Sequence, residues 1–253
     1  MFDTGGVPVP APDLASLRLL GERVRPLAGA GERTLPVPGP LGDLLPRGGL
    51  QRGTLVATTG PAATTLALAL SGPTTVSGSW AAVVGLPHLG LLAAAELGVD
   101  LGRLVLVADP EPAAWAATVA GLLDAVEVVL VRPPRAVGTS TQRRLEARAR
   151  DRGSVLVQVG GSPDAWAQAP HLVVTATDAA WSGIGQGYGH LRARRVTVGV
   201  TGRRGADRPR RAALWLPDAH GRITAVDTAV EPAVEPAAAP DRGTAARGTA
   251  REA

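Results

Sequence analysis

The segment Thr59-Gly60-Pro61-Ala62-Ala63-Thr64-Thr65 joins a run of apolar residues to a helix-like run, and its residue types are those of a phosphate-binding loop. In the pattern G-x-x-x-x-G-K-[ST], backbone N–H groups surround the phosphates, the lysine reaches the β- and γ-phosphates, and the hydroxyl binds Mg²⁺. The chain keeps Gly60, Thr64 and Thr65 but lacks the second glycine and the lysine, and none of its 253 residues is lysine. The sequence therefore predicts a degenerate nucleotide site without the cation that hydrolysis requires.

Two further positions lack the acidic residues of a nucleotide-hydrolysing site. Val84-Gly85-Leu86 offers no carboxylate where a glutamate would activate water, and Arg132 follows an apolar run where an aspartate would hold Mg²⁺. We therefore expect no catalytic residue, no cofactor and no enzymatic activity. Weak nucleotide binding at Gly60 to Thr65 stays open, because a helix N-terminus attracts phosphate through its backbone N–H groups.

Composition narrows the remaining chemistry. The chain has no cysteine, and its histidines do not show the spacing of metal ligands; they are His88, His171, His190 and His220. We therefore expect no metal site. The N-terminus lacks a secretory signal, and the apolar stretch 81–95 is too short and too interrupted to span a membrane. The sequence predicts a cytoplasmic protein without membrane contact, and its net charge of +4 is compatible with binding to nucleic acid.

Short apolar runs alternate with helical segments through the middle of the chain. Strands are expected at 55–58, 80–84, 104–107, 126–131 and 155–159, with helices at 64–70, 89–97, 112–123 and 140–150. Such short Val- and Leu-rich strands are typical of a parallel sheet covered on both faces. Strands without helices follow at 171–177, 191–200 and 212–216, which predicts an antiparallel C-terminal edge. The Gly-rich stretch 183–189 is interpreted as a hairpin connection, and 218–221 as another turn.

The two ends differ from this core. We divide the chain into an N-terminal segment, 1–33, a core, 34–228, and an Ala-, Pro- and Arg-rich tail, 229–253, which is expected to be disordered. A helix over 13–25 would place Leu14, Leu17, Leu20 and Val24 on one face. That face could pack on the chain's own core or form an interface with another subunit or a partner.

The core resembles the RecA family of P-loop proteins. The resemblance is carried by the glycine-flanked lead-in 47–56, by the Gly-Pro and Thr-Thr-Leu of the turn and helix start, and by Leu97-Gly98-Val99-Asp100 before the next strand. Together with Leu35-Pro36-Val37-Pro38-Gly39-Pro40, Gly78-Ser79-Trp80 and 191–196, these motifs are similar to the actinobacterial ImuA-prime proteins, which are related to ImuA and SulA. The resemblance covers about residues 35 to 220.

This resemblance implies a RecA-like α/β fold: a mostly parallel sheet flanked by helices. It also implies a non-catalytic role in SOS-induced translesion DNA synthesis. The expected partner is an ImuB-type protein and, through it, an error-prone polymerase and the sliding clamp, which would bring the chain to the nucleoid. Self-association is possible. Three alternatives remain open: a DNA-binding RecA-like module, an unconventional ATP-binding recombinase relative, and a SulA-like inhibitor of cell division that acts on FtsZ.

Arginines near the C-terminal strands are the candidate contacts with a partner or with DNA. They are Arg192, Arg194, Arg195, Arg203, Arg204, Arg210 and Arg211. Planar guanidinium groups bind carboxylate or phosphate oxygens in pairs, although a solvated hairpin rim explains such a charge run equally well. Protein contact is favoured slightly over DNA, because no aromatic residues are interleaved to stack bases. We expect Trp80, Trp115, Trp166 and Trp181 to pack in or beside the core.

Overall fold

The computed structural model describes residues 33–134, 137–163, 166–185, 188–203, 206 and 208–226. Its strands are β1 (Thr34–Pro36), β2 (Gly49–Gln51), β3 (Leu55–Thr59), β4 (Ala81–Val84), β5 (Leu104–Val107), β6 (Val128–Val131), β7 (Val155–Val159), β8 (Leu172–Gly185), β9 (Tyr188–Gly202), β10 (Arg210–Trp215) and β11 (Thr224–Ala225). Its helices are α2 (Gly39–Gly42), α3 (Ala63–Val76), α4 (Leu91–Glu96), α5 (Pro112–Ala125) and α6 (Thr139–Arg152), with a 3₁₀ turn, η1, at Leu101–Arg103. No helix in these ranges combines the length and apolar character needed to cross a membrane.

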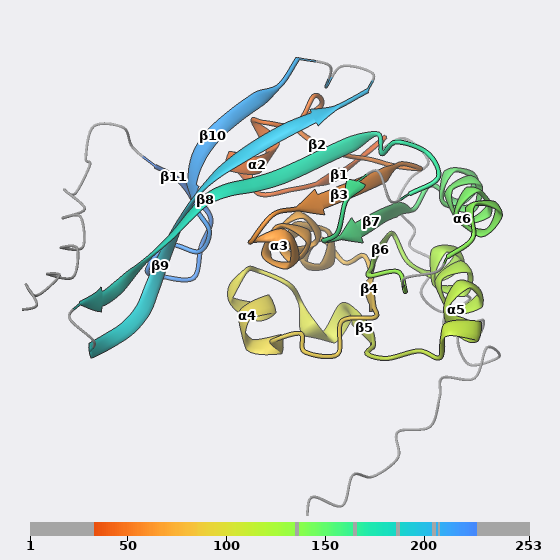
Figure 1. Cartoon of the computed structure of the whole chain (residues 1–253), viewed down its shortest axis with the longest axis horizontal. Coiled ribbons are helices and arrows are strands. Elements are labelled where there is room, and N and C mark those ends of the chain that lie inside the picture. Colours follow the sequence, from red (N-terminus) through yellow and green to blue (C-terminus); the bar gives the residue numbers. More distant parts are fainter. Residues whose placement is uncertain are drawn as a thin grey trace, which may run out of the picture.

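One large sheet organises the molecule. Its strand order is β11-β10-β9-β8-β3-β7-β6-β4-β5, and β1 and β2 form a separate antiparallel pair (Figure 1). The strands from β8 to β5 in this order are mutually parallel, whereas β9, β10 and β11 extend the sheet in antiparallel fashion. The predicted mostly parallel sheet with an antiparallel C-terminal edge is therefore confirmed.

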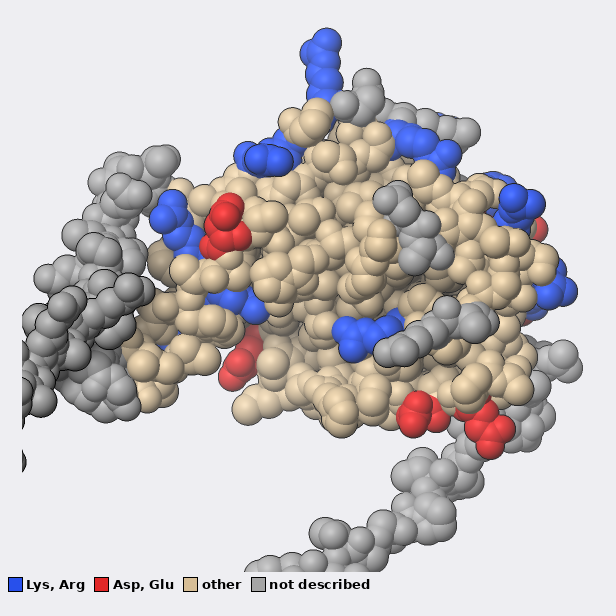
Figure 2. Space-filling view, viewed as in Figure 1, with Lys and Arg blue, Asp and Glu red and all other residues tan. Residues whose placement is uncertain are grey.

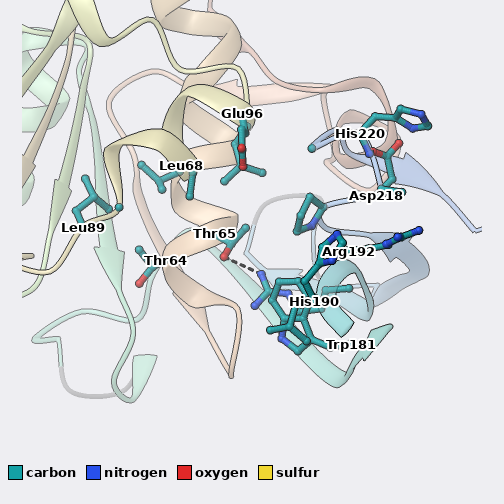
Figure 3. Close-up of a pocket in the computed structure, with 18 of the residues that line it drawn as sticks. Thr64, Thr65, Leu68, Leu89, Glu96, Trp181, His190, Arg192, Asp218 and His220 are labelled. Atoms are coloured by element: carbon teal, nitrogen blue, oxygen red, sulfur yellow. Dashed lines mark hydrogen bonds between the residues drawn. The ribbon is translucent and has the colours of Figure 1, made fainter. Parts of the chain in front are cut away.

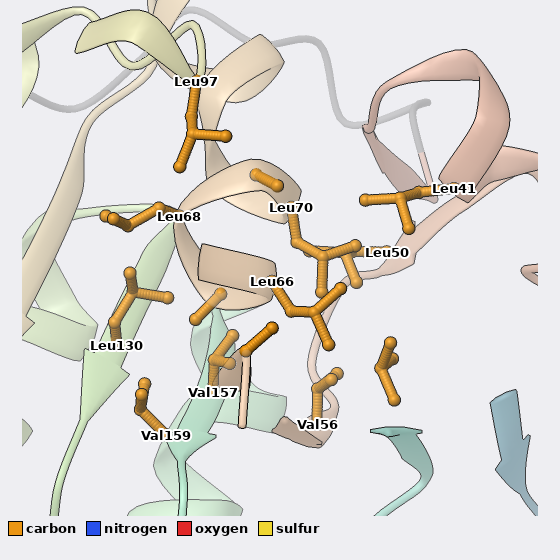
Figure 4. Close-up of a cluster of buried hydrophobic side chains, with 14 of the residues drawn as sticks. Leu41, Leu50, Val56, Leu66, Leu68, Leu70, Leu97, Leu130, Val157 and Val159 are labelled. Carbon is orange, nitrogen blue, oxygen red and sulfur yellow. The ribbon is translucent and has the colours of Figure 1, made fainter. Parts of the chain in front are cut away.

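Helices cover both faces of the parallel strands. Leu66 and Leu70 of α3 pack with Val56 and Val157 in one buried cluster (Figure 4), while α5 and α6 pack on the opposite face in a second cluster that contains Trp115. Strands β3, β4, β6 and β7 are buried along their whole length. This burial on two sides explains why their sequences are largely apolar instead of alternating, with Thr58, Thr59 and Gln158 as the polar exceptions.

Helix α3 is longer than the sequence prediction, which ended it at Leu70. It continues through Pro73 to Val76, although proline removes one backbone N–H donor from a helix interior. Ten residues of α3 are buried, and packing of this kind outweighs local propensity in a helix that is fixed on a sheet. The backbone of Gly72 also lies against the carbonyl of Gly98, where a side chain would crowd the loop after α4.

Strands β8 and β9 form a long hairpin that extends past the body of the sheet (Figure 1). The predicted strands, 171–177 and 191–200, were too short because the exposed outer part of the hairpin has no apolar alternation. Its last described pairs are Ile184 with Gly189 and Gly185 with Tyr188, so the Gly-rich stretch does connect two antiparallel strands, as predicted. Gly183 and Gly189 both have positive φ and face each other closely.

Candidate functional site

The turn between β3 and α3 is the segment in which the sequence predicts a degenerate phosphate-binding loop. Only Gly60, Pro61 and Ala62 separate the last residue of β3 from the first residue of α3. Gly60 has φ +84°, and a Cβ atom there would overlap the carbonyl oxygen of Ala176 on β8. Pro61 has no backbone N–H to offer a ligand. This short turn is therefore pressed against β8 and lacks the length and the donors to enclose a chain of phosphates.

The two positions at which acidic residues were sought lie in contact with each other. Gly85 follows β4 with φ +78°, and a Cβ atom there would lie 2.7 Å from the carbonyl oxygen of Arg132. The backbone N–H of Arg132, which follows β6, donates to the carbonyl of Val84 at 3.0 Å. A side chain at position 85 does not fit this backbone arrangement. In the described part of the chain, no group of three His, Cys, Asp or Glu residues could hold a metal ion.

Two guanidinium groups reach the first turn of α3. Arg194 donates from Nη2 to Thr65 Oγ1 at 2.7 Å (Figure 3), and Arg132 Nη2 lies 3.5 Å from Thr64 Oγ1, at the long limit of a hydrogen bond. These are the two hydroxyls retained from the phosphate-loop pattern. Both therefore accept from arginine side chains of the chain itself.

Arg194 is an internal residue, which corrects its prediction as a surface contact. It is only 8% exposed, its Nε donates to the carbonyl of Leu216 at 2.8 Å, and its guanidinium lies 4.9 Å from the ring centroid of Trp181. Burial lowers its pKa, and it forms no ion pair with any described residue. Arg194 thus links β9 to α3 and to the end of β10 by hydrogen bonds. Its charge is stabilised by the Thr65 hydroxyl, the Leu216 carbonyl and the ring of Trp181.

A cleft of about 740 Å³ opens beside this contact, between α3 and α4 on one side and the β8–β9 hairpin and the turn at 217–221 on the other (Figure 3). Its apolar lining includes Leu68, Leu89, Leu97 and Leu191. Trp181 also lines it and is 47% exposed.

The four tryptophans that were predicted to pack in or beside the core differ in their burial. Trp115 and Trp166 are buried, as predicted, and Trp80 is half-buried beside the core. Trp181 departs from the prediction, since it faces solvent in the cleft.

The polar residues of the cleft come from different elements. Arg194 lies against Trp181, His190 and Arg192 lie near Trp181, Asp218 and His220 lie beside Arg192, and Glu96 lies apart on the α4 side (Figure 3). The cleft therefore has an apolar lining with an aromatic and arginine-bearing part. Such a lining suits recognition of an apolar side chain next to an anionic group.

Asp218 belongs to the turn rather than to a reacting site. Its carboxylate accepts the backbone N–H groups of His220 at 2.8 Å and Arg222 at 2.9 Å. Burial alone would raise the pKa of Asp218, but these backbone hydrogen bonds from Arg222 and His220 outweigh it and hold that pKa below its usual range. The carboxylate is thus committed to holding the turn together.

The remaining predicted arginines differ in their exposure and contacts, and on the face shown in Figure 2 the basic side chains are scattered instead of gathered in one patch. Arg192 lies in the cleft and Arg195 is half-exposed on β9. Arg203 is exposed and donates to the carbonyl of Ala169, and Arg210 is exposed and donates to the carbonyl of Leu45 at 3.2 Å. Arg211 is exposed on β10. Arg204 lies outside the described residues, as do the predicted interface of Leu14, Leu17, Leu20 and Val24 and the tail 229–253.

Sequence reasoning missed the association of Thr65, Trp181, His190 and Arg194. Thr65 on α3 is separated by more than a hundred positions from the other three residues, which lie on the two strands of the hairpin. The only signal in the sequence was a tryptophan just before the Gly-rich hairpin connection.

Comparisons with known proteins find similarity to a mycobacterial protein and to one family model. The model, described as the MT3502 N-terminal domain, matches residues 43–168. The Mycobacterium tuberculosis protein Rv3395c, described as uncharacterized, is 38% identical over 156 residues, which cover 60% of this chain and 71% of that protein. The range of the family model includes the short turn, Gly85 and Arg132.

Proposed function

From the premise that the chain belongs to the same family as the mycobacterial protein Rv3395c, we propose that it is a non-catalytic, RecA-like accessory protein of SOS-induced translesion DNA synthesis. It acts by contacts with an ImuB-type polymerase relative, and through that protein with an error-prone polymerase and the sliding clamp. Because the mycobacterial relative is uncharacterized, it supplies no activity that could be transferred to this chain. The proposal therefore rests on the residues of this chain.

The order of the parallel strands supports the RecA-like part of the proposal. The strand that leads into the candidate loop, β3, lies between β7 and β8, with β6, β4 and β5 following on the β7 side. Helices cover both faces, and the loop after β3 opens directly into α3. This is the arrangement in which an α/β protein presents a helix N-terminus to a ligand at the carboxyl ends of its strands.

The observation that carries the non-catalytic part is the three-residue turn Gly60-Pro61-Ala62 in a chain without lysine. A triphosphate needs a loop of backbone donors and a cation at its β- and γ-oxygens. Here the turn is tight, the hydroxyls of Thr64 and Thr65 accept from arginines, and Gly85 and Arg132 stand where carboxylates would serve Mg²⁺ and water. In this proposal the strands and helices of a RecA-like domain are kept, whereas the lysine and the two carboxylates of its nucleotide site are replaced.

The cleft is the surface that we assign to the partner. It brings together an exposed tryptophan, an exposed arginine and apolar side chains, which is the composition of residues that dominate binding energy at protein interfaces. Arg195, Arg203 and Arg211 do not line the cleft, so in this proposal they lie outside the partner surface, and Arg203 and Arg211 stay candidate contacts for the DNA-binding alternative.

Two measurements on the full chain test the proposal. First, the purified protein is incubated with labelled ATP, Mg²⁺ and single-stranded DNA, and no release of phosphate above the protein-free control is expected. Second, binding to a purified ImuB-type protein is measured by calorimetry, and a saturable complex is expected. Hydrolysis would support the recombinase alternative, and failure to bind the ImuB-type protein would refute the partner assignment.

The remaining alternatives predict different results in parallel experiments. A DNA-binding module would be retained on DNA in a salt-dependent way and released by neutralising Arg203 and Arg211. A SulA-like inhibitor would suppress polymerisation of purified FtsZ. We expect neither result from this chain.

A further inference from the structure

The last strand of the large sheet, β5, has one open edge. It pairs with β4 and with no other described strand, so the backbone N–H and C=O groups on its outer side have no partner in the sheet (Figure 1). Its sequence is Leu104-Val105-Leu106-Val107, and Leu106 is 39% exposed. An open edge of this kind is a template for pairing with another strand.

The elements that precede this edge also expose apolar side chains. Val76 at the end of α3 is 69% exposed, Leu92 on α4 is 74% exposed, and Leu101, in the turn leading into β5, is 40% exposed. The strand itself contains no charged residue and no proline, and its pairing with β4 is regular. Natural sheets usually protect an edge with charged residues, proline, a bulge or a very short strand, and of these β5 has only the short length of four residues. An apolar edge without the other devices indicates a surface that another chain covers.

The charges at the two ends of β5 indicate that the chain covering this edge is a second copy of the same protein. Arg103 immediately precedes the strand and is half-buried; it lies 3.6 Å from Asp100 and donates to the carbonyl of Gly78 within its own chain. Asp109 and Glu111 follow the strand and are exposed. When two antiparallel copies of one strand are related by a two-fold axis, the beginning of each strand lies beside the end of the other. Arg103 of one copy then lies near Asp109 of the second copy, twice in the same interface. The β5 edge is thus complementary to itself in both apolar character and charge.

We propose that the β5 edge is a homodimer interface, in which β5 of one copy pairs antiparallel with β5 of a second copy and continues the sheet across a two-fold axis. The strand has only four residues, so the interface is at the small end of specific interfaces and the dimer exchanges with monomer. This surface lies outside the cleft, because none of β5 or η1 lines it. The proposal therefore stands independently of the proposed function.

Sedimentation velocity of the full chain over a range of concentrations tests the dimer. The wild-type chain is expected to shift from monomer to dimer as concentration rises. Leu106→Lys places a charge on the edge strand and is expected to weaken dimerisation at least about tenfold. The matched control is Leu191→Lys, which changes a similarly exposed leucine, 50% exposed, on the β8–β9 hairpin and is expected to dimerise as the wild type does. A wild-type chain that stays monomeric, or equal effects of both lysines, would overturn the proposal.

A charge-exchange experiment distinguishes self-pairing from any other occupant of the edge. Asp109→Arg alone places like charges at both ends of the dimer, and Arg103→Glu alone does the same with opposite sign, so each variant is expected to be monomeric. An equimolar mixture places an opposite-charge pair at both ends and is expected to recover dimers of mixed composition.

The mixture also controls for local damage, because Arg103 donates to the carbonyl of Gly78 at 2.7 Å and its loss perturbs that turn. Recovery of dimers on mixing requires both variants to be folded. If the mixture stays monomeric while thermal unfolding shows both chains folded, the antiparallel arrangement is wrong. If only one variant dissociates, the Arg103–Asp109 pairing is wrong.

Discussion

Arg194 on β9 donates a 2.7 Å hydrogen bond to Thr65 on the first turn of α3, across 129 positions of sequence. The bond joins the antiparallel extension of the sheet to the helix that a phosphate-binding loop would precede. It also occupies a hydroxyl that could otherwise bind a ligand. A contact that stabilises the fold thus lies where the sequence predicts a degenerate nucleotide site.

Replacing Arg194 is expected to destabilise the protein. Arg194→Met keeps much of the side-chain volume but removes the hydrogen bonds to Thr65 and to the carbonyl of Leu216. Leaving the carbonyl of buried Leu216 unpaired costs about 2 kcal/mol, whereas Thr65 is only half-buried and lines the cleft. The cost is offset in part because a buried charge is also removed. Urea unfolding measures the free energy directly. Arg192→Met, two residues away and exposed, is the control and is expected to change stability by less than about 0.5 kcal/mol.

Gly60 should tolerate no side chain. Gly60→Ala adds a Cβ atom that overlaps the carbonyl of Ala176 in a backbone conformation with φ +84°. The β3–α3 turn or β8 must move, and a loss of about 2–4 kcal/mol of unfolding free energy is expected.

Gly121→Ala is the opposite case, because Gly121 lies inside α5 with open space around its Cα. That variant should gain about 0.5–1 kcal/mol in the same urea experiment. Equal destabilisation by both alanines would contradict the close contact between the β3–α3 turn and β8.

Glu146 on α6 should make stability fall as pH rises. It is 5% exposed, and burial raises the pKa of its carboxyl, against the opposing effects of the Trp166 indole and of Arg150, Arg203 and Arg143. The folded state then holds the proton more tightly than the unfolded state. Its contribution is most favourable below the ordinary carboxyl pKa of about 4.3 and is lost as pH rises through the raised value. Glu146→Gln cannot ionise and should be more stable than wild type at neutral pH, with a difference that shrinks towards about pH 4.

Asp124 at the end of α5 should behave in the opposite direction. Burial would raise the pKa of Asp124, but hydrogen bonds and charges from Arg148 and Arg152 of α6 outweigh it and lower that pKa. The carboxylate therefore stabilises the fold above its ordinary pKa, and this contribution is lost as pH falls through the lowered value. Asp124→Asn should lose stability at neutral pH and converge with wild type in acid. Because the arginines are exposed, high salt should reduce the difference. A difference that grows in acid would refute this assignment.

The strands of the parallel sheet and most helices could be predicted from the sequence, because buried strands carry short Val- and Leu-rich runs. β7, which is buried on both faces, and the edge strand β5 have the predicted bounds, and α5 begins at the predicted Pro112. The pattern failed where distant contacts override it. α3 passes Pro73 because the sheet holds it, and the exposed end of the β8–β9 hairpin is fixed by backbone pairing that leaves no apolar alternation.

The candidate site was only half predictable, for the same reason. The missing lysine and the residues Gly85 and Arg132 are local features of the sequence. The burial of Arg194 is not, because its environment comes from Thr65, Trp181 and Leu216. In sequence it is one arginine of a charged run, 192–195, whereas the pleat of β9 turns alternate side chains to opposite faces. That alternation separates Arg194 from Arg195, whereas Arg192 shares its face and lines the cleft.

Trp181 should report on the proposed partner surface. Trp181→Ala removes an exposed aromatic side chain from the cleft, together with its stacking on Arg194, and Arg192→Ala removes the neighbouring cation. Truncating a central tryptophan or arginine of an interface typically costs about 2 kcal/mol or more of binding free energy. We therefore expect calorimetry to show that the double variant binds the ImuB-type protein at least about thirty-fold more weakly. Ile184→Ala, at a 57% exposed position on the same strand but absent from the cleft lining, is the control and should bind normally. If the double variant binds as wild type while retaining its unfolding temperature, the partner contacts another face of the molecule.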